Sequence, residues 1–239
     1  MTLTLVTALL LIQADKAALA EEAAKALKAT AAKGFEAAGE GSFKADKDHE
    51  DYAEWLGGDS ATLTAAVQGS FEAVVTVKAK KATYEVFHKG ARTVERLTWR
   101  GSPVDSSDSA NDILSLLDLA KLAGAAAKAI AAKAAGDETL GEVKCRKIRV
   151  TLDGTAIGSY LERDPDDEAD PGYRVETVEV TLWIDADGLV RKLDGAVTKI
   201  FDDGEGDEVK LVDTWTFTFA KFGATKVEFP PELKKALSD

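Results

Sequence analysis

Few residues in this sequence could serve as a nucleophile, a general base or a metal ligand. Cys145 is the one cysteine, and His49 and His88 are the two histidines. A cysteine beside a histidine can form a reactive thiolate, and Cys145 with His88 is the conceivable pair. On a regular strand Cys145 shares a face with Lys147 and Arg149, whose charges could lower the pKa of the thiol. A lone cysteine is nevertheless most often a small buried apolar residue, and we favour that interpretation.

The sequence motifs of several reaction classes are missing. There is no GxSxG nucleophile elbow, no phosphate-binding loop and no dinucleotide fingerprint. No CxxC, HExxH or HxH spacing is present, which argues against a zinc site. We therefore expect no enzyme activity, no cofactor and no bound metal.

Two acidic segments, residues 164–170 and 202–208, are candidate calcium sites. Calcium needs about six to eight oxygen ligands in a fixed array. Neither segment has EF-hand spacing, and the Asp185-Ala186-Asp187-Gly188 sequence lacks the rest of such a loop. We interpret both segments as solvated loops that also protect sheet edges.

Composition restricts the partners. The chain has 239 residues, of which 45% are hydrophobic, and its net charge is −12. This length fits one large β domain, and the hydrophobic content is sufficient for a core. The negative charge argues against binding to nucleic acid or to anionic lipid headgroups, which both require Lys and Arg. A basic protein partner remains open.

The N-terminal segment contains the apolar run LTLVTALLLI, residues 3–12. The run is too short to span a bilayer, which takes about 20 residues, but it suits a signal peptide. Ala18-Leu19-Ala20 is a small-x-small cleavage pattern, and Ala14 offers a second site. We predict that residues 1–20 are a signal peptide, that the protein is periplasmic or secreted, and that it has no stable membrane insertion. No Lys or Arg precedes the run, so the alternative is a buried first helix or strand of a cytoplasmic protein.

Apolar residues at alternate positions predict a β-rich chain. The expected strands cover residues 35–45, 63–78, 83–88, 93–100, 143–152, 155–161, 173–184, 189–201 and 209–221. The segment 63–78 reads as one unusually long strand with a kink at Gly69. Asp185 to Gly188 is predicted to be a hairpin turn.

Helical periodicity is expected in a few places. An alanine-rich helix is predicted over residues 15–33, with Gly34 ending it. A second helical segment is predicted over 112–135, capped by Ser109 or Asn111. The sequence HEDYAEWL suggests a short helix before residue 58, and Pro230 with Pro231 would open a short terminal one.

This order of elements resembles the LolA/LolB-like superfamily, which includes the LolA lipoprotein carriers and the LppX/LprG-type lipid-binding proteins. The resemblance is carried by RTVERLTWRG before the central helical segment, by VTLWIDADGLVRKLDG, and by WTFTFAKFGATKVEFPPEL. It implies an α+β fold in which helices cover the concave face of a curved, unclosed antiparallel sheet, a half-barrel. Residues 21–239 would form this single domain, with a helical insertion around 111–135. No functional residue of the superfamily maps onto this chain.

The resemblance implies a non-catalytic carrier or binder of a hydrophobic ligand, either a lipid or a lipoprotein acyl chain. Small alanine side chains on the helices either allow close packing or leave space over the sheet. Large strand residues would line such a space or would fill an ordinary core, and alternation does not settle whether they share one face: Phe71, Val75, Tyr84, Phe87, Trp99, Trp183, Trp215, Phe217 and Phe219. The alternative function is a structural or protein-interaction module of the cell envelope with a filled core, which would contact an envelope protein.

Overall fold

A long helix and a large antiparallel sheet make up most of the computed structural model, which describes residues 2–45, 60–69, 71–80, 82–90, 92–99, 102–104, 114, 117–153, 174–202, 208–233 and 237. The helices are α1, Thr2–Lys33, and α4, Leu119–Ala126, with a 3-10 turn, η1, at Pro231–Leu233. The strands are β1 Phe35–Ala45, β2 Ser60–Gln68, β3 Glu72–Lys78, β4 Ala82–Lys89, β5 Arg92–Trp99, β6 Ser102–Val104, β7 Ala131–Leu140, β8 Val143–Asp153, β9 Arg174–Ile184, β10 Val190–Asp202 and β11 Glu208–Ala220.

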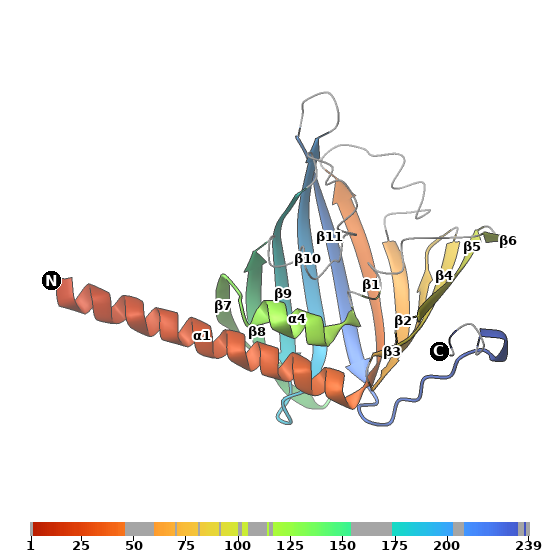
Figure 1. Cartoon of the computed structure of the whole chain (residues 1–239). Helices are drawn as coiled ribbons and strands as arrows, with labels where there is room; N and C mark the ends of the chain where they lie inside the picture. The colour runs from red at the N-terminus through yellow and green to blue at the C-terminus, as the bar shows by residue number, and fades with distance from the viewer. Residues whose placement is uncertain are drawn as a thin grey trace.

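The described strands form one 11-stranded sheet in the order β6-β5-β4-β3-β2-β1-β11-β10-β9-β8-β7. All neighbouring pairs are antiparallel. The first and last strands meet in the middle, where Ala37 pairs with Phe219 and Gly41 with Trp215. β6 and β7 are the two edge strands, so the sheet is not closed into a barrel. Figure 1 shows that the sheet is curved. The α+β half-barrel architecture expected from the sequence is confirmed.

The sheet has an inner, concave face, which α1 and α4 cross, and an outer face (Figure 1). The inner face carries the odd-numbered residues of β1, β2, β3 and β11 and the even-numbered residues of β4, β8 and β9, because side chains alternate along a strand. The register shift between Thr198 and Lys199 of β10 changes the phase at the start of β9, so the odd-numbered Val175 also lies on this face. One cross-strand row runs from β5 to β8 on this face: Leu97, Tyr84, Val77, Leu63, Gly39, Phe217, Leu193, Leu182 and Ile148. The alternation read from the sequence therefore produces one continuous apolar face.

Helix α1 packs on the inner face through small side chains. Ala23 and Leu27 have no exposed area, and Ala26 is 3% exposed. Thr30 is also buried; its hydroxyl donates to the Ala26 carbonyl at 2.8 Å and accepts the Val190 N–H at 2.9 Å. This bond satisfies a buried backbone donor at the start of β10 and joins the helix to the sheet. Among the described residues, no helix combines the length and the apolar character needed to cross a bilayer.

The single strand predicted over residues 63–78 is wrong, because that segment is the hairpin β2–β3. Gln68 pairs with Glu72, and the turn between them contains Gly69 at φ 56° and Phe71 at φ 64°. A loop of three residues keeps residues of equal parity opposite each other, so Val67 pairs with Ala73 and Ala65 with Val75. The apolar alternation therefore continues in phase through the turn and imitates one long strand.

The helical segment predicted over 112–135, the helical insertion of the expected domain, is wrong at its C-terminal end. α4 ends at Ala126, and Ala131 to Leu140 form strand β7. The alanines of this stretch favour a helix locally, but pairing with β8 supplies hydrogen bonds that outweigh this preference. Gly136, at φ 89°, lies at a bulge where the register shifts. Asp118 caps α4 by accepting the Lys121 N–H at 3.0 Å, while the proposed caps Ser109 and Asn111 lie outside the described residues.

The remaining predicted strands agree with β1, β4, β5 and β8 to β11, and the Asp185–Gly188 turn is confirmed by the Gly188 N–H to Asp185 carbonyl bond of 3.0 Å. The short terminal helix is the η1 turn. The helix suggested by HEDYAEWL, the strand 155–161 and the acidic segment 164–170 lie outside the described residues.

The C-terminal segment, residues 221–233, runs along the outer face. The Gly223 N–H bonds to the Lys33 carbonyl at 3.1 Å, next to the end of α1. The Val227 N–H bonds to the Gln68 side chain at 3.0 Å. In η1, Glu232 forms an ion pair of 3.3 Å with Arg96 of β5. The segment thus connects the end of α1 to the outer side of β2 and β5.

Candidate ligand-binding surface on the inner face

Aromatic side chains occupy the middle of the inner face, on β11. Trp215 and Phe217 lie beside Gly195 and Gly39 of the neighbouring strands. A Cβ atom built on Gly195 would come within 2.2 Å of Trp215 Cε2, and one built on Gly39 within 2.4 Å of Phe217 Cδ1. Glycine is therefore required at both positions so that each ring can lie flat across the next strand. Phe219 packs edge-on against Phe35 with ring centroids 5.1 Å apart.

Several of the predicted lining residues belong to a packed core. Val75 has no exposed area, Phe217 is 2% exposed, Phe219 is 4% exposed and Tyr84 is 7% exposed. Side chains covered to this extent offer no surface to a ligand in this conformation. The more accessible residues of the inner face pack against them.

A smaller set of inner-face apolar residues is only partly buried against this core. We call it the open apolar set: Phe71, Val77, Leu97, Val175 and Trp215. Val77 and Leu97 flank Tyr84 in one cross-strand row. Phe71 and Trp215 were among the predicted ligand-binding residues, whereas Val77, Leu97 and Val175 were not. An apolar ligand on the inner face could contact these five residues directly.

Polar side chains lie within this apolar surface on β4 and β5. We call Tyr84, His88, Thr93 and Glu95 the polar corner. The Tyr84 hydroxyl donates a hydrogen bond to the Glu95 carboxylate. His88 Nδ1 is 2.9 Å from Thr93 Oγ1. All four share the inner face, since His88 pairs with Thr93, and Val86, between Tyr84 and His88, pairs with Glu95.

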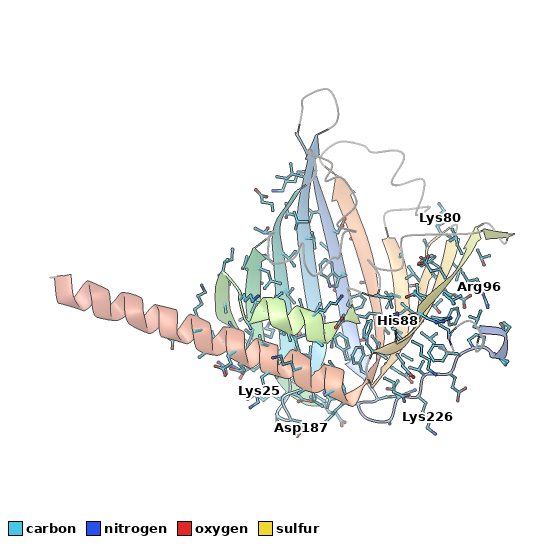
Figure 2. All side chains as sticks on the ribbon, in the orientation of Figure 1. Lys25, Lys80, His88, Arg96, Asp187 and Lys226 are labelled. Atoms are coloured by element: carbon cyan, nitrogen blue, oxygen red, sulfur yellow. The ribbon has the colours of Figure 1, made fainter. Side chains whose placement is uncertain are left out.

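His88 lies on the β4 side of α4 (Figure 2). Burial lowers the pKa of His88 from its ordinary value of 6.5, with an opposing contribution from Asp118 and a smaller lowering one from Lys121. The imidazole is therefore neutral at pH 7. The effects of Asp118 and Lys121 place the first residues of the α4 region close to the polar corner. The Phe71 ring also packs near His88, with centroids 5.5 Å apart.

Two predicted lining residues, Phe87 and Trp183, point to the outer face. Phe87 is 2% exposed and lies 5.5 Å from the guanidinium carbon of Arg96. The Trp183 ring is flanked by Lys192 Nζ at 4.3 Å and Lys147 Nζ at 5.7 Å. We therefore leave both residues out of the candidate surface. The side chain of Trp99 lies outside the described part of the chain.

Cys145 lies on the outer face of β8, away from His88, which is on the inner face of β4. The thiol is 1% exposed, and burial raises its pKa, with the nearby Asp185 charge adding to this effect. The expectation that Lys147 and Arg149 lower the thiol pKa is therefore wrong. Their positive charges are directed elsewhere, since Lys147 pairs with Glu138 at 3.0 Å and Arg149 Nε bonds to Thr181 at 3.3 Å.

A groove of about 390 Å³ crosses the outer face of β11, β1, β2 and β3. It is lined mainly by small side chains, which include Ala38, Thr64, Ala66 and Thr218. Within the described ranges, no group of three or more His, Cys, Asp or Glu side chains could hold a metal ion.

The sequence predicts a strand over residues 93–100 but does not show which face of the sheet Thr93 and Glu95 occupy, so the polar corner was not predicted. The signal was present in RTVERL: Thr93 and Glu95 have the same parity as Leu97, so they must share its face. Only the pairing with β4 tells which face that is.

No protein-family model and no curated protein matches the sequence. Among solved structures, the lipoprotein LppX of Mycobacterium tuberculosis aligns at 16% identity with a TM-score of 0.50, over 88% of this chain and 97% of that chain. LprF from Mycobacterium bovis aligns at 16% identity with a TM-score of 0.39, over 88% and 95%. A DUF1329 family protein from Desulfovibrio piger aligns at 11% identity with a TM-score of 0.33, over 92% and 98%. The likeness to LppX shows that this chain has the same fold, as the resemblance to the LppX type predicted.

Proposed function

We propose that this protein is a non-catalytic carrier or binder of a hydrophobic ligand, a lipid or a lipoprotein acyl chain, in the periplasm or outside the cell. The observation that carries the proposal is the open apolar set on the concave face of an unclosed sheet. Phe71, Val77, Leu97, Val175 and Trp215 remain partly exposed there although a packed core lies beside them. Partly exposed apolar side chains on a concave face are a common feature of ligand sites.

The physical driving force is the removal of apolar surface from water. Each methylene group of an acyl chain that is buried contributes about 0.8 kcal/mol. A long chain lying along the row of Val77 and Leu97, or against Trp215, would therefore be held without a charged contact. The fold also favours reversible binding, because α1 packs on the sheet through alanines whose contact area is small.

Binding is tested with delipidated protein and a fluorescent fatty-acid probe. We expect saturable uptake that unlabelled lipid displaces. Val77→Asn should weaken binding about tenfold, since burial of a valine side chain contributes about 1.5 kcal/mol. Val74→Asn is the matched control, because Val74 lies on the same strand and is also partly buried, but lines the outer groove.

The absence of saturable uptake would refute the proposal, and so would equal losses of affinity in the two variants. In that event the alternative is a structural or protein-interaction module of the envelope. The outer groove favours this alternative, because its small side chains would let another chain approach closely. A partner retained by the protein and released by Val74→Asn would support it.

The proposed location outside the cytoplasm rests on the signal peptide predicted over residues 1–20. The described burial along α1 supports cleavage near Ala20: Asp15, Ala17 and Ala18 are exposed, whereas Ala20 is 4% exposed and Ala23 is fully buried. Removal of residues 1–20 would thus leave nearly all of the described helix–sheet contact intact. Mass spectrometry of the exported protein should find Glu21 as the first residue. A protein that retains residues 1–20 and stays in the cytoplasm would contradict the proposal.

A further inference from the structure

The polar corner occupies an unusual position, because its four side chains lie on the apolar face of the sheet. Tyr84 is part of the inner-face core, yet its hydroxyl bonds to Glu95. Val77 and Leu97 are its direct neighbours on β3 and β5. A carboxylate on an apolar face loses hydration, and the Tyr84 hydroxyl compensates part of this loss, so this part of the face is suited to a polar group of a ligand.

The corner remains accessible. Thr93 is exposed, and His88 and Glu95 are partly exposed. Phe71, Val77 and Leu97 lie around these groups and are partly exposed as well. The same patch can therefore contact an apolar chain and a polar group at once, which is what an amphiphilic ligand needs.

The groups of the corner also restrict the chemistry of that polar group. Glu95 offers a carboxylate, which accepts hydrogen bonds and repels anions. His88 shares Nδ1 with Thr93, so Nε2 either donates or accepts, depending on the tautomer. A hydroxyl group both donates and accepts, so it suits either tautomer and the carboxylate. The charges of Asp118 and Lys121, which both act on His88, oppose each other.

We propose that the polar corner binds the uncharged, hydroxyl-bearing head of an amphiphile whose apolar chain lies on Phe71, Val77 and Leu97. This inference rests on the proposed function and adds a ligand class to it. Free fatty acids and other anionic amphiphiles bind less well, because their head would approach Glu95. The corner acts as a specificity-determining site and performs no chemistry.

The test uses three ligands with the same oleoyl chain, each displacing one uncharged fluorescent fatty-acid ester at about pH 8, where oleate is ionised. They are 1-monooleoylglycerol, methyl oleate and oleate. We expect 1-monooleoylglycerol to bind about fivefold tighter than methyl oleate, which lacks hydroxyl groups, and at least about tenfold tighter than oleate. The first comparison isolates the hydroxyl groups, and the second isolates the charge.

Variants assign the preference to the corner. Glu95→Gln keeps the shape but removes the charge, and it should bring oleate within about twofold of methyl oleate. Thr93→Val should weaken 1-monooleoylglycerol several-fold and leave methyl oleate unchanged. Glu85→Gln is the matched control, because Glu85 lies on the outer face of β4, beside Arg96 at 3.6 Å, and should leave all three affinities unchanged.

The outcomes separate this inference from the proposed function. Equal affinity for the three ligands, or tighter binding of oleate, overturns the head-group inference and leaves hydrophobic carriage standing. The expected preference, if it persists in Glu95→Gln and Thr93→Val, overturns the assignment to the polar corner. A failure of all three ligands to displace the probe, or of the probe to bind, overturns the proposed function itself.

Discussion

Gly39 tests the packing of the aromatic side chains of β11, because an added methyl group at this position has no room. The Cβ of Gly39→Ala would lie 2.1 Å from the Thr216 carbonyl oxygen and 2.4 Å from Phe217 Cδ1. Ordinary contacts of a Cβ atom begin near 3.4 Å, so each neighbour would have to move by about 1 Å. Phe217 could turn its ring, but the Thr216 carbonyl belongs to the backbone of β11, which is paired with β1. Relief therefore requires the central strand pair to separate locally.

Overpacking of this kind costs about 1–3 kcal/mol in the free energy of unfolding. For a chain of this size, that loss lowers the melting temperature by about 3–10 °C. Gly41→Ala is the matched control on the same strand and face. Its Cβ would meet the Thr214 carbonyl oxygen at 3.4 Å, an ordinary contact. Since alanine also reduces the entropy of the unfolded chain, Gly41→Ala should be neutral or stabilising by about 0.4–1 kcal/mol.

The assay is urea unfolding followed by circular dichroism, with the free energy extrapolated to water and the m-values compared. We expect Gly39→Ala to unfold at a clearly lower urea concentration than Gly41→Ala, with similar m-values. Free energies within about 0.5 kcal/mol of each other would refute the packing of Phe217 across Gly39, because the two substitutions are chemically identical.

Three further predictions concern the side chains of Thr30, His88 and Cys145. Thr30→Val should cost about 1–3 kcal/mol in the free energy of unfolding, because the buried Val190 N–H loses its acceptor, whereas Thr30→Ser should cost less; urea unfolding measures both, and equal costs would contradict this role of the hydroxyl. His88 has a lowered pKa in the folded state, so the unfolded chain binds the proton first as the pH falls through about 6.5, and stability should decrease from about pH 7.5 to about pH 5. His88→Gln should make this decrease smaller in urea unfolding at each pH, and an unchanged pH profile would contradict it. Cys145 has a raised pKa and a buried thiol, so its reaction with an aromatic disulfide reagent, followed by absorbance at about pH 8, should be much slower in the native protein than in urea. Equal rates in the two states would contradict the burial of this thiol.

The elements that the sequence predicted well have a strong local signal. Residues 209–221 alternate cleanly between apolar and polar side chains, and β11 covers nearly the same range. The Asp185–Gly188 turn has the Asp and Gly residues that a tight hairpin requires, and Asp185 accepts the N–H groups of Asp187 and Leu189, both at 2.9 Å. Such features depend on neighbours within a few residues, which the sequence displays directly.

The elements that the sequence misplaced depend on distant neighbours. Ala131 to Ala135 have helical preference, but β8 lies beside them and converts them into an edge strand. Phe87 and Trp183 have aromatic side chains like Phe217, but their parity within paired strands turns them to the outer face. Neighbouring residues of a strand point to opposite faces of the sheet, so a shift of one residue moves a side chain from one face to the other. The register of the paired strands decides which face each side chain takes.

By itself, the amino-acid sequence determined the acidic composition, the lack of common catalytic motifs and most strand positions, because these follow from residue types and their local period. The α+β class was implied by the resemblance to the LolA/LolB-like superfamily. The tertiary structure decided that β1 pairs with β11, that Phe71 and Trp215 remain partly exposed beside a filled core, and that Glu95 and His88 share the apolar face. These features arise from contacts between strands far apart in the chain, whose register is set by the packing of the whole sheet.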